Sequence, residues 1–265
     1  MENNNQMPSE HIGRLFDESS MNYLLSRTKQ AMWSMVKYKE LQMCYTCALK
    51  EVETKFEVLS TEFNLKHKRN PIASIHTRLK RLESIIDKMH RYRVPITLES
   101  MEANINDVAG VRIVCSYIDD IYSIADAFLK QDDITLITAK DYIKNPKDNG
   151  YRSLHLIVSI PVFFADSKKN VKVEVQIRTI AMDFWASLEH KMYYKFEGNA
   201  PENIRRELKE CADLVAFLDQ KMLVINEEIK HYSGEEEDDD TELDGELREM
   251  YGTVLDEKKV FEEAV

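Results

Sequence analysis

The sequence predicts an α+β fold, and three stretches of the chain lead to that prediction. In residues 171–179 (VKVEVQIRT), aliphatic side chains alternate with polar ones, which is the pattern of a strand with one face in a core. Residues 20–65 repeat apolar side chains at helical spacing, and residues 201–229 repeat them with a heptad period. The two periodicities in one chain indicate a sheet accompanied by long helices.

The strand at residues 171–179 has a polar face made of an acid, an amide and two cations. These residues are Lys172, Glu174, Gln176 and Arg178. Alternating strands often have one solvated face, so one interpretation is that this polar face is simply exposed to water. However, four chemically active groups on one rigid surface also form a good platform for a reaction. An aromatic-rich helix is expected directly afterwards, over residues 180–196.

A basic stretch, residues 74–93, is predicted to be a second helix. Its buried stripe would be Leu82, Ile85, Ile86 and Met89, and its other side would carry Arg78, Lys80, Arg81, Ser84, Lys88 and Arg91. From residue 66 to 93 there are nine Lys and Arg residues and two acids. Such cations repel one another along one face, so either the face is solvated or a polyanionic phosphate ligand binds it.

Shorter elements are expected between these stretches. Asp107 lies in a turn that leads into a strand, where Val111, Ile113 and Cys115 share one face. A helix is expected at 119–130, a strand at 134–139, and a strand at 154–160. The loop at 140–153 offers lysines, a glycine, Tyr151 and an arginine, a composition that suits nucleotide binding with base stacking on the tyrosine.

The composition favours a globular protein and argues against several classes. The 265 residues are 43% hydrophobic and 31% charged, and there is neither an 18-residue apolar run nor a signal-peptide pattern, so a cytoplasmic location is expected. A net charge of −11 argues against a protein that coats nucleic acid. Ten Asp and Glu residues lie within residues 235–249, and this acidic run predicts a disordered tail.

Missing motifs narrow the chemistry further. The chain has no GxxxxGK[ST] loop, no GxGxxG and no His-Asp pair of a metal phosphohydrolase. One CxxC, at Cys44 and Cys47, lies inside a helical pattern without a second close pair, so reduced thiols are expected in place of a zinc site.

Three segments in order resemble the synthetase domain of RelA/SpoT-type alarmone synthetases. They are Asp107, the run Gly150-Tyr151-Arg152-Ser153-Leu154-His155, and Glu174-Val175-Gln176-Ile177-Arg178-Thr179. The short chain and the continuation through residues 181–190 are similar to the stand-alone small synthetases of the RelP and RelQ types. The resemblance covers about residues 70–198.

The resemblance implies a fold and an activity. The fold is a nucleotidyltransferase-like mixed β-sheet flanked by helices, with long N- and C-terminal helices. The activity is transfer of the β,γ-diphosphate of ATP to the 3′-hydroxyl of GTP or GDP with Mg²⁺, which releases AMP and gives (p)ppGpp for stringent-response signalling, without a hydrolase domain.

The resemblance also assigns roles to individual residues. Glu174 and Asp107 are the catalytic and metal-binding pair, with Glu174 as the general base. The ATP-binding residues are Arg78, Lys80, Ser84, Lys88, Arg91 and Arg112, and the GTP- or GDP-binding residues are Lys140, Lys147, Tyr151, His155 and Gln176. His155 also has an alternative role as a neutral histidine satisfied within the sheet. Phe184 and Trp185 are expected in the core.

The expected organisation is a flexible N-terminus (1–18), a synthetase domain with its terminal helices (19–232, core about 70–198) and the acidic tail (233–265). The tail has a possible short helix from Leu243. By resemblance the protein assembles as a homotetramer, and the heptad seam would pack on the N-terminal helix or on another subunit. RNA is a possible regulator, and no membrane partner is expected.

Two other functions remain open from the residues. Related toxic small synthetases modify the 3′ end of tRNA, and the basic stretch at 66–93 is compatible with that substrate. A non-catalytic module that binds alarmone or RNA is the other, although a pure binder does not need two convergent carboxylates. The preferred acceptor, GDP, GTP or GMP, does not follow from the sequence.

Overall fold

The computed structural model describes residues 18–67, 69–196 and 200–233. Contacts divide the chain into two units, with the boundary after Cys44. The predicted mobile N-terminus and acidic tail, with its short helix, lie almost entirely outside the described residues. The elements are α1 (Glu18–His67), β1 (Ile72–Leu79), α2 (Leu82–Tyr92), α3 (Leu98–Asn104), β2 (Ala109–Cys115), α4 (Ile118–Leu129), β3 (Thr135–Asp141), β4 (Leu154–Phe163), β5 (Lys168–Thr179), α5 (Ile180–Lys195) and α6 (Glu202–Ser233).

The described part of the first unit is the helical segment 18–44, which forms the beginning of α1. The second unit contains the rest of α1 and every strand. No helix in the described part of the chain combines the length and the apolarity that a bilayer crossing requires.

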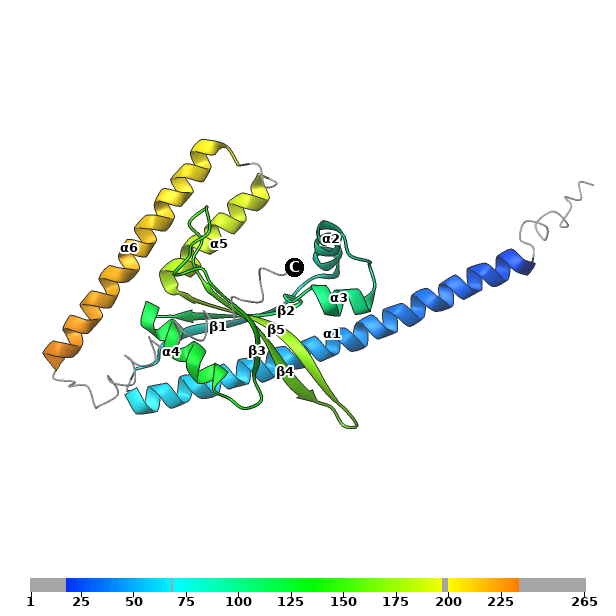
Figure 1. Cartoon of the computed structure of the whole chain (residues 1–265), viewed down its shortest axis with the longest axis horizontal. Helices are drawn as coiled ribbons and strands as arrows, with labels where there is room; N and C mark the ends of the chain where they lie inside the picture. Colours follow the sequence, from blue (N-terminus) through cyan, green and yellow to red (C-terminus); the bar gives the residue numbers. More distant parts are fainter. Residues whose placement is uncertain (1–17, 68, 197–199, 234–265) are drawn as a thin grey trace, which may run out of the picture. The chain divides into compact units, whose positions relative to one another are not determined.

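The second unit is built on a mixed five-stranded sheet in the order β1-β2-β5-β4-β3 (Figure 1). β2 and β5 are parallel, and the other three neighbouring pairs are antiparallel. The predicted α+β class and mixed sheet are therefore confirmed. β5 lies at the centre, so its polar face is bordered by strands on both sides.

The apolar face of the sheet is the core that the alternating pattern predicted. Val173, Val175 and Ile177 of β5 are fully buried, as are Ile113 and Cys115 of β2. Helix α4 runs beside the second-unit part of α1 (Figure 1), and Phe128 of α4 stacks on Phe56 of α1 with ring centroids 4.5 Å apart. Burial of large apolar side chains stabilises this face by about 1.5–3 kcal/mol for each.

The prediction of one helix over residues 74–93 was wrong. Residues 72–79 form the edge strand β1, whose partner is β2, and only residues 82–92 are helical. Ile72, Ile75 and Thr77 are β-branched and favour a strand, a signal that the count of cations obscured. Ile85 and Met89 are buried as predicted, but Leu82 is 39% exposed.

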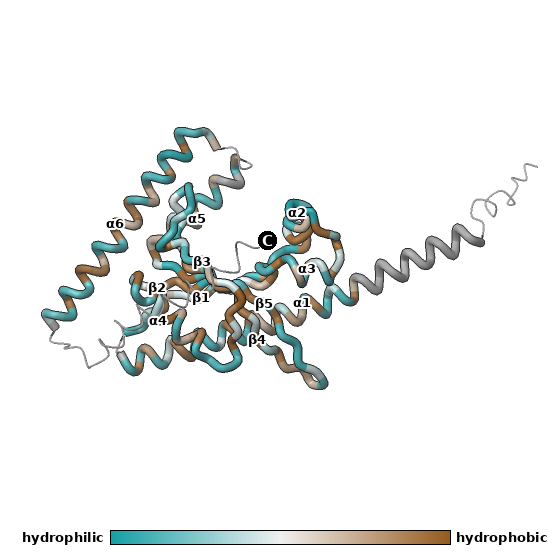
Figure 2. The backbone as a smooth tube through the Cα atoms, viewed as in Figure 1, coloured by the Kyte–Doolittle hydropathy of each residue, from teal (hydrophilic) through white to brown (hydrophobic). Residues whose placement is uncertain are grey.

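The C-terminal helix α6 is confirmed, and its heptad seam has two different halves. Leu208 and Val215 pack against Trp185 and Ala212, and Trp185 Nε1 donates to the Leu208 carbonyl at 2.8 Å. The seam therefore packs first on α5, a partner that the sequence analysis did not name. Its later members Leu218, Met222, Ile225 and Ile229 are exposed, and Figure 2 shows hydrophobic and hydrophilic residues alternating along the whole helix.

Two smaller expectations can now be compared with the structure. Trp185 is buried as expected, but Phe184 is 63% exposed, so the core assignment of Phe184 was wrong. All four cysteines are free thiols in the structure: Cys44 and Cys115 are buried, Cys47 is half-buried and Cys211 is exposed. No cluster of three or more potential metal-binding side chains occurs among the described residues.

Candidate active site

The strand register brings six of the predicted site residues onto one face of the sheet. Residues paired directly across strands share a face, and one row across the sheet is His76, Arg112, Gln176, His155 and Lys140. The adjacent row is Arg78, Gly110, Glu174 and Ile157. Gly110 is the direct neighbour of Glu174 across the β2–β5 pair. The polar face of β5 is thus the floor of a site that extends over all five strands.

Glu174 is a mostly buried carboxylate with two partners. Its side chain is 19% exposed; Gln176 Nε2 donates to Oε2 at 2.8 Å, and His155 Nδ1 lies 3.5 Å from Oε1. Burial by itself would raise the pKa of Glu174, but His155 and Gln176 outweigh it and lower that pKa below its ordinary value. Glu174 is therefore ionised at neutral pH. Arg178 and Lys172 are the two cations on the same face of β5. Neither forms an ion pair with Glu174 among the described residues, where its partners are Gln176 and His155.

Asp107 is held between two lysines. Lys80 Nζ lies 2.6 Å from Oδ2 and Lys88 Nζ lies 3.0 Å from Oδ1. Burial would raise the pKa of Asp107, but the two ammonium groups lower it overall. Oδ1 is buried, and Lys88 is its ion-pair partner within the described residues.

The two carboxylates are close enough for the charge of Asp107 to act on the pKa of Glu174. Asp107 precedes β2 by two residues, and the start of β2 pairs with Glu174 through Gly110. A hard divalent cation takes one or two protein carboxylates together with substrate phosphates. Asp107 and Glu174 are two mostly buried carboxylates that are both ionised at neutral pH, and such a pair fits a divalent ion.

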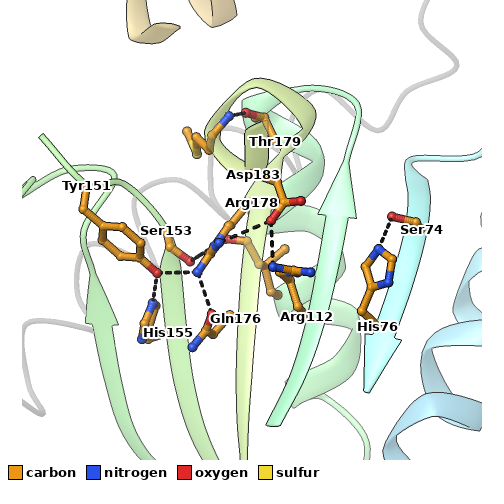
Figure 3. Close-up of polar contacts among 12 residues, drawn as sticks. Ser74, His76, Arg112, Tyr151, Ser153, His155, Gln176, Arg178, Thr179 and Asp183 are labelled. Atoms are coloured by element: carbon orange, nitrogen blue, oxygen red, sulfur yellow. Dashed lines mark hydrogen bonds and ion pairs between the residues drawn. The ribbon is translucent and has the colours of Figure 1, made fainter. Parts of the chain in front are cut away.

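Tyr151, His155 and Arg178 form a hydrogen-bonded chain (Figure 3). His155 extends this chain to Glu174. Arg178 Nη2 donates to the Tyr151 hydroxyl at 2.6 Å, which in turn lies 2.8 Å from His155 Nε2. Burial lowers the pKa of His155 below its usual value, although Glu174 opposes that change. The ring is therefore neutral at pH 7. Because Arg178 is only a donor, Tyr151 donates to Nε2 and the ring proton on Nδ1 faces Glu174.

Sequence reasoning missed the residue that joins the two arginines of this face. Asp183 Oδ1, in the first turn of α5, lies 3.2 Å from Arg112 Nη1 and 3.3 Å from Arg178 Nη1 (Figure 3). The signal was present, since Asp183 is five residues beyond Arg178 and one helical turn past the end of β5. Arg112 Nε remains buried without a hydrogen-bond partner in the described residues.

The other predicted residues lie on both sides of these carboxylates. On α2, Ser84 and Arg91 flank Lys88 at helical spacing, and Arg78 and Arg91 are exposed. On the opposite side, Lys147 Nζ lies 4.6 Å from the ring centroid of Tyr142 and 4.8 Å from that of Tyr151. Tyr142 was not predicted, and it meets His155 edge-on with 5.2 Å between centroids.

Helix α6 holds the loop that carries Tyr151. Gly150 has φ of +86°, and a Cβ there would lie 2.5 Å from the Cβ of Ala212. Arg152 Nη1 donates to the carbonyl of Ala212 at 3.2 Å. Gly150 therefore does more than form a turn, because its lack of a side chain allows α6 to approach this loop.

We expect Gly150→Ala to destabilise the protein by about 1–3 kcal/mol, because it combines a left-handed backbone with a steric clash. Urea unfolding of the variant and the wild type measures this difference. Gly110→Ala is the matched control, since its Cβ would meet the Arg78 carbonyl oxygen at an ordinary 3.8 Å. Equal stability of Gly150→Ala and wild type would show that α6 does not press on this loop.

A mixed sheet with two carboxylates on a cation-lined face is suited to an enzyme that binds a phosphorylated substrate together with a divalent ion. Residues 77–199 match the family model described as the region found in RelA / SpoT proteins. The chain is 47% identical over 195 residues to the GTP pyrophosphokinase YwaC of Bacillus subtilis, covering 74% of this chain and 93% of that protein. The protein therefore belongs to the RelA/SpoT family, within its group of small alarmone synthetases.

Solved structures agree with this assignment. The crystal structure of small alarmone synthetase 2 from Bacillus subtilis aligns with a TM-score of 0.67 at 46% identity, covering 72% of this chain and 98% of that chain. Small alarmone synthetase 1 from the same organism, bound to its product pppGpp, aligns with a TM-score of 0.69 at 34% identity, covering 73% and 98%.

Proposed function

We propose that this protein is a (p)ppGpp synthetase that transfers the β,γ-diphosphate of ATP to the 3′-hydroxyl of GTP or GDP. The observation that carries the proposal is the pair Glu174 and Asp107 at the centre of one sheet face, with cations on both sides. The matched relatives are named for this activity or for its product. The sequence has no His-Asp pair of a metal phosphohydrolase, which agrees with synthesis in place of hydrolysis.

The ATP side of the site is the surface of β1, α2 and β2. Lys80 and Lys88 hold Asp107. The other assigned residues lie on these elements: Arg78 on β1, Ser84 and Arg91 on α2, and Arg112 on β2. Fixed cations stabilise the negative charge that moves onto the leaving AMP during phosphoryl transfer. The buried Nε of Arg112 has no hydrogen-bond partner in the described residues, so it is available to donate a hydrogen bond to an atom of the bound ATP.

The acceptor side is the surface of β5, β4 and the loop before β4. We assign Tyr151 to stacking on guanine, and Lys140, Lys147, His155 and Gln176 to contacts around the acceptor nucleotide. Glu174 takes the proton of the 3′-hydroxyl. A bond then forms between that oxygen and the β-phosphorus of ATP, the bond from the α,β-bridging oxygen to this phosphorus breaks, and AMP leaves. Because the pKa of Glu174 is low, the base is ionised before substrate arrives.

We propose Mg²⁺ as the metal, held by Asp107 and Glu174 together with substrate phosphates. The bound ion would neutralise phosphate charge and orient the diphosphate. Zinc prefers three or four protein ligands. Among the described residues no group of three potential ligands occurs, so the two carboxylates suit Mg²⁺ better than zinc.

The test is incubation of the purified protein with γ-³²P-ATP, Mg²⁺ and either GDP or GTP, followed by thin-layer chromatography. Labelled ppGpp or pppGpp is expected, and the faster acceptor defines the preference. If no guanosine nucleotide is labelled, the proposal fails. A parallel reaction with bulk tRNA would then reveal a tRNA 3′-end pyrophosphokinase, and tight nucleotide binding without any transfer would reveal a binding module.

Tyr151→Ala is expected to raise the KM for GTP by about 5- to 150-fold, because stacking on a base contributes about 1–3 kcal/mol. The KM for ATP should stay within about twofold, since the assigned ATP residues lie on other elements. Tyr151→Phe is the control, because it keeps the ring and loses only the hydroxyl bonded to Arg178 and His155. Steady-state kinetics with each substrate varied separately measures both constants. A similar rise in both KM values would contradict the stacking role.

We further propose that the protein is a homo-oligomer, specifically a homotetramer. The exposed half of the α6 seam supports this, because apolar side chains at heptad spacing suit a partner helix. Size-exclusion chromatography with light scattering measures the mass directly. We propose a cytoplasmic location, where nucleotide substrates are present. We also propose RNA as a regulator of the enzyme.

A further inference from the structure

Lys172 lies two residues before Glu174 on the polar face of β5, and its side chain reaches the end of α3. Its Nζ donates to the carbonyl of Glu102 at 3.1 Å and to the carbonyl of Ala103 at 3.2 Å. Both carbonyls belong to the end of α3, where the last carbonyl groups lack helical partners and carry partial negative charge. The lysine therefore binds the C-terminus of this short helix.

The same ammonium group reaches the loop that carries Asp107. Lys172 Nζ lies 3.2 Å from Asn106 Oδ1, and Asn106 is bonded directly to Asp107 in the chain. On the other side of the loop, Lys80 N donates to the Val108 carbonyl at 2.8 Å. The loop is thus held on one side by the segment that follows β1 and on the other by the strand that carries Glu174.

We propose that Lys172 is a positioning residue that sets the spacing between Asp107 and Glu174. This inference depends on the proposed function, because the spacing matters only if the two carboxylates act together. A shared Mg²⁺ requires near-ideal octahedral geometry, and a catalytic constellation must be held within about 0.5 Å. Lys172 belongs to the strand that carries Glu174, and it binds the segment that precedes Asp107. None of its hydrogen bonds goes to either carboxylate.

The chain offers a matched control in Lys169. It lies on the same strand, and its Nζ lies 2.8 Å from Glu102 Oε1 of the same helix, but both side chains are about 40% exposed. This ion pair involves a side chain of α3, whereas Lys172 binds its terminal carbonyls and Asn106. Removing Lys169 therefore removes one lysine contact between β5 and α3 and keeps the hold on the Asp107 loop.

The first measurement is a Mg²⁺ titration of alarmone synthesis by wild type, Lys172→Met and Lys169→Met. Loss of an outer group that orients a metal ligand typically costs about 10- to 100-fold in metal affinity or activity. We expect a change of that size for Lys172→Met, in kcat and in the Mg²⁺ concentration for half-maximal rate, with the KM values for ATP and GTP within about twofold. Lys169→Met should behave as wild type.

The second measurement needs neither metal nor turnover. Amide hydrogen exchange of the free protein should become faster in residues 98–108 of Lys172→Met and stay unchanged in Lys169→Met, because helix-end amides exchange through local opening. Lys172→Arg, which keeps charged donors, should restore most of the protection. A double-mutant cycle with Asn106→Leu should show that the two substitutions are not additive, as expected for groups in contact.

The outcomes separate this inference from the proposed function. If wild type makes no labelled guanosine product, the proposed function fails. If wild type is active but Lys172→Met and Lys169→Met have equal effects on Mg²⁺ dependence and on exchange, the positioning role is overturned. A loss confined to nucleotide KM, with Mg²⁺ dependence and exchange unchanged, also overturns it.

Discussion

Glu174→Gln is expected to lower kcat for (p)ppGpp synthesis by at least about 10³-fold, because it removes a general base and an anionic metal ligand together. Glutamine has nearly the same shape, so the side chain still meets Gln176 and His155 in the centre of the sheet. It cannot accept the proton of the 3′-hydroxyl at neutral pH. Product formation from γ-³²P-ATP, read by thin-layer chromatography, measures the loss.

Nucleotide binding is the control for this substitution. ATP and GTP affinities, measured by calorimetry without turnover, are expected to change by less than about tenfold, because the cations and Tyr151 remain in place. Raising Mg²⁺ should not restore the rate, since an amide does not replace the base. Activity of Glu174→Gln within about tenfold of wild type would remove Glu174 from the role of base.

Asp107→Asn is expected to lower activity by about 10²- to 10³-fold at low Mg²⁺, and to recover partly when Mg²⁺ is raised. The physical reason is that Asp107 contributes charge to the metal site and also orders Lys80 and Lys88. An amide is a weaker ligand for a hard cation, and it leaves both partly buried ammonium groups without their counter-ion. Rate against Mg²⁺ concentration distinguishes this variant from Glu174→Gln.

Lys130→Met is a suitable control for the loss of a lysine–aspartate pair elsewhere. Lys130 pairs with Asp126 at 2.6 Å on α4, with its own side chain 57% exposed, so the effect should be within about 1 kcal/mol on stability and absent from the rate. If Asp107→Asn is no more affected than Lys130→Met at every Mg²⁺ concentration, Asp107 is not a metal ligand.

Much of the central strand could be predicted from its own residues. The alternation of Val173, Val175 and Ile177 with polar groups predicted the buried face and the polar face, because side chains of a strand alternate by geometry. The same reasoning did not find β1, since a count of cations was weighted above the β-branched residues around them. Phe184 was also misplaced, because an aromatic residue near a core was assumed to belong to it.

The site residues assigned by resemblance are brought together by register, which no local pattern contains. Arg112, Gln176 and His155 come from three strands and share a row only because β2, β5 and β4 pair as they do. The ion pairs of Asp183 depend on where α5 begins beside the sheet. The hydrogen bonds of Lys172 depend on where α3 ends. The side chains involved are ordinary charged residues in the sequence.

The sequence by itself determined the α+β class, the polar face of β5, the two carboxylates and the heptad period of α6, because each depends on local periodicity or on an ordered set of motifs. The tertiary structure alone decided how these parts meet. It placed α6 on α5 and against Gly150, where the glycine leaves room for Ala212. It also placed Asp107 between two lysines, because contacts between residues distant in sequence are set by strand pairing and helix packing.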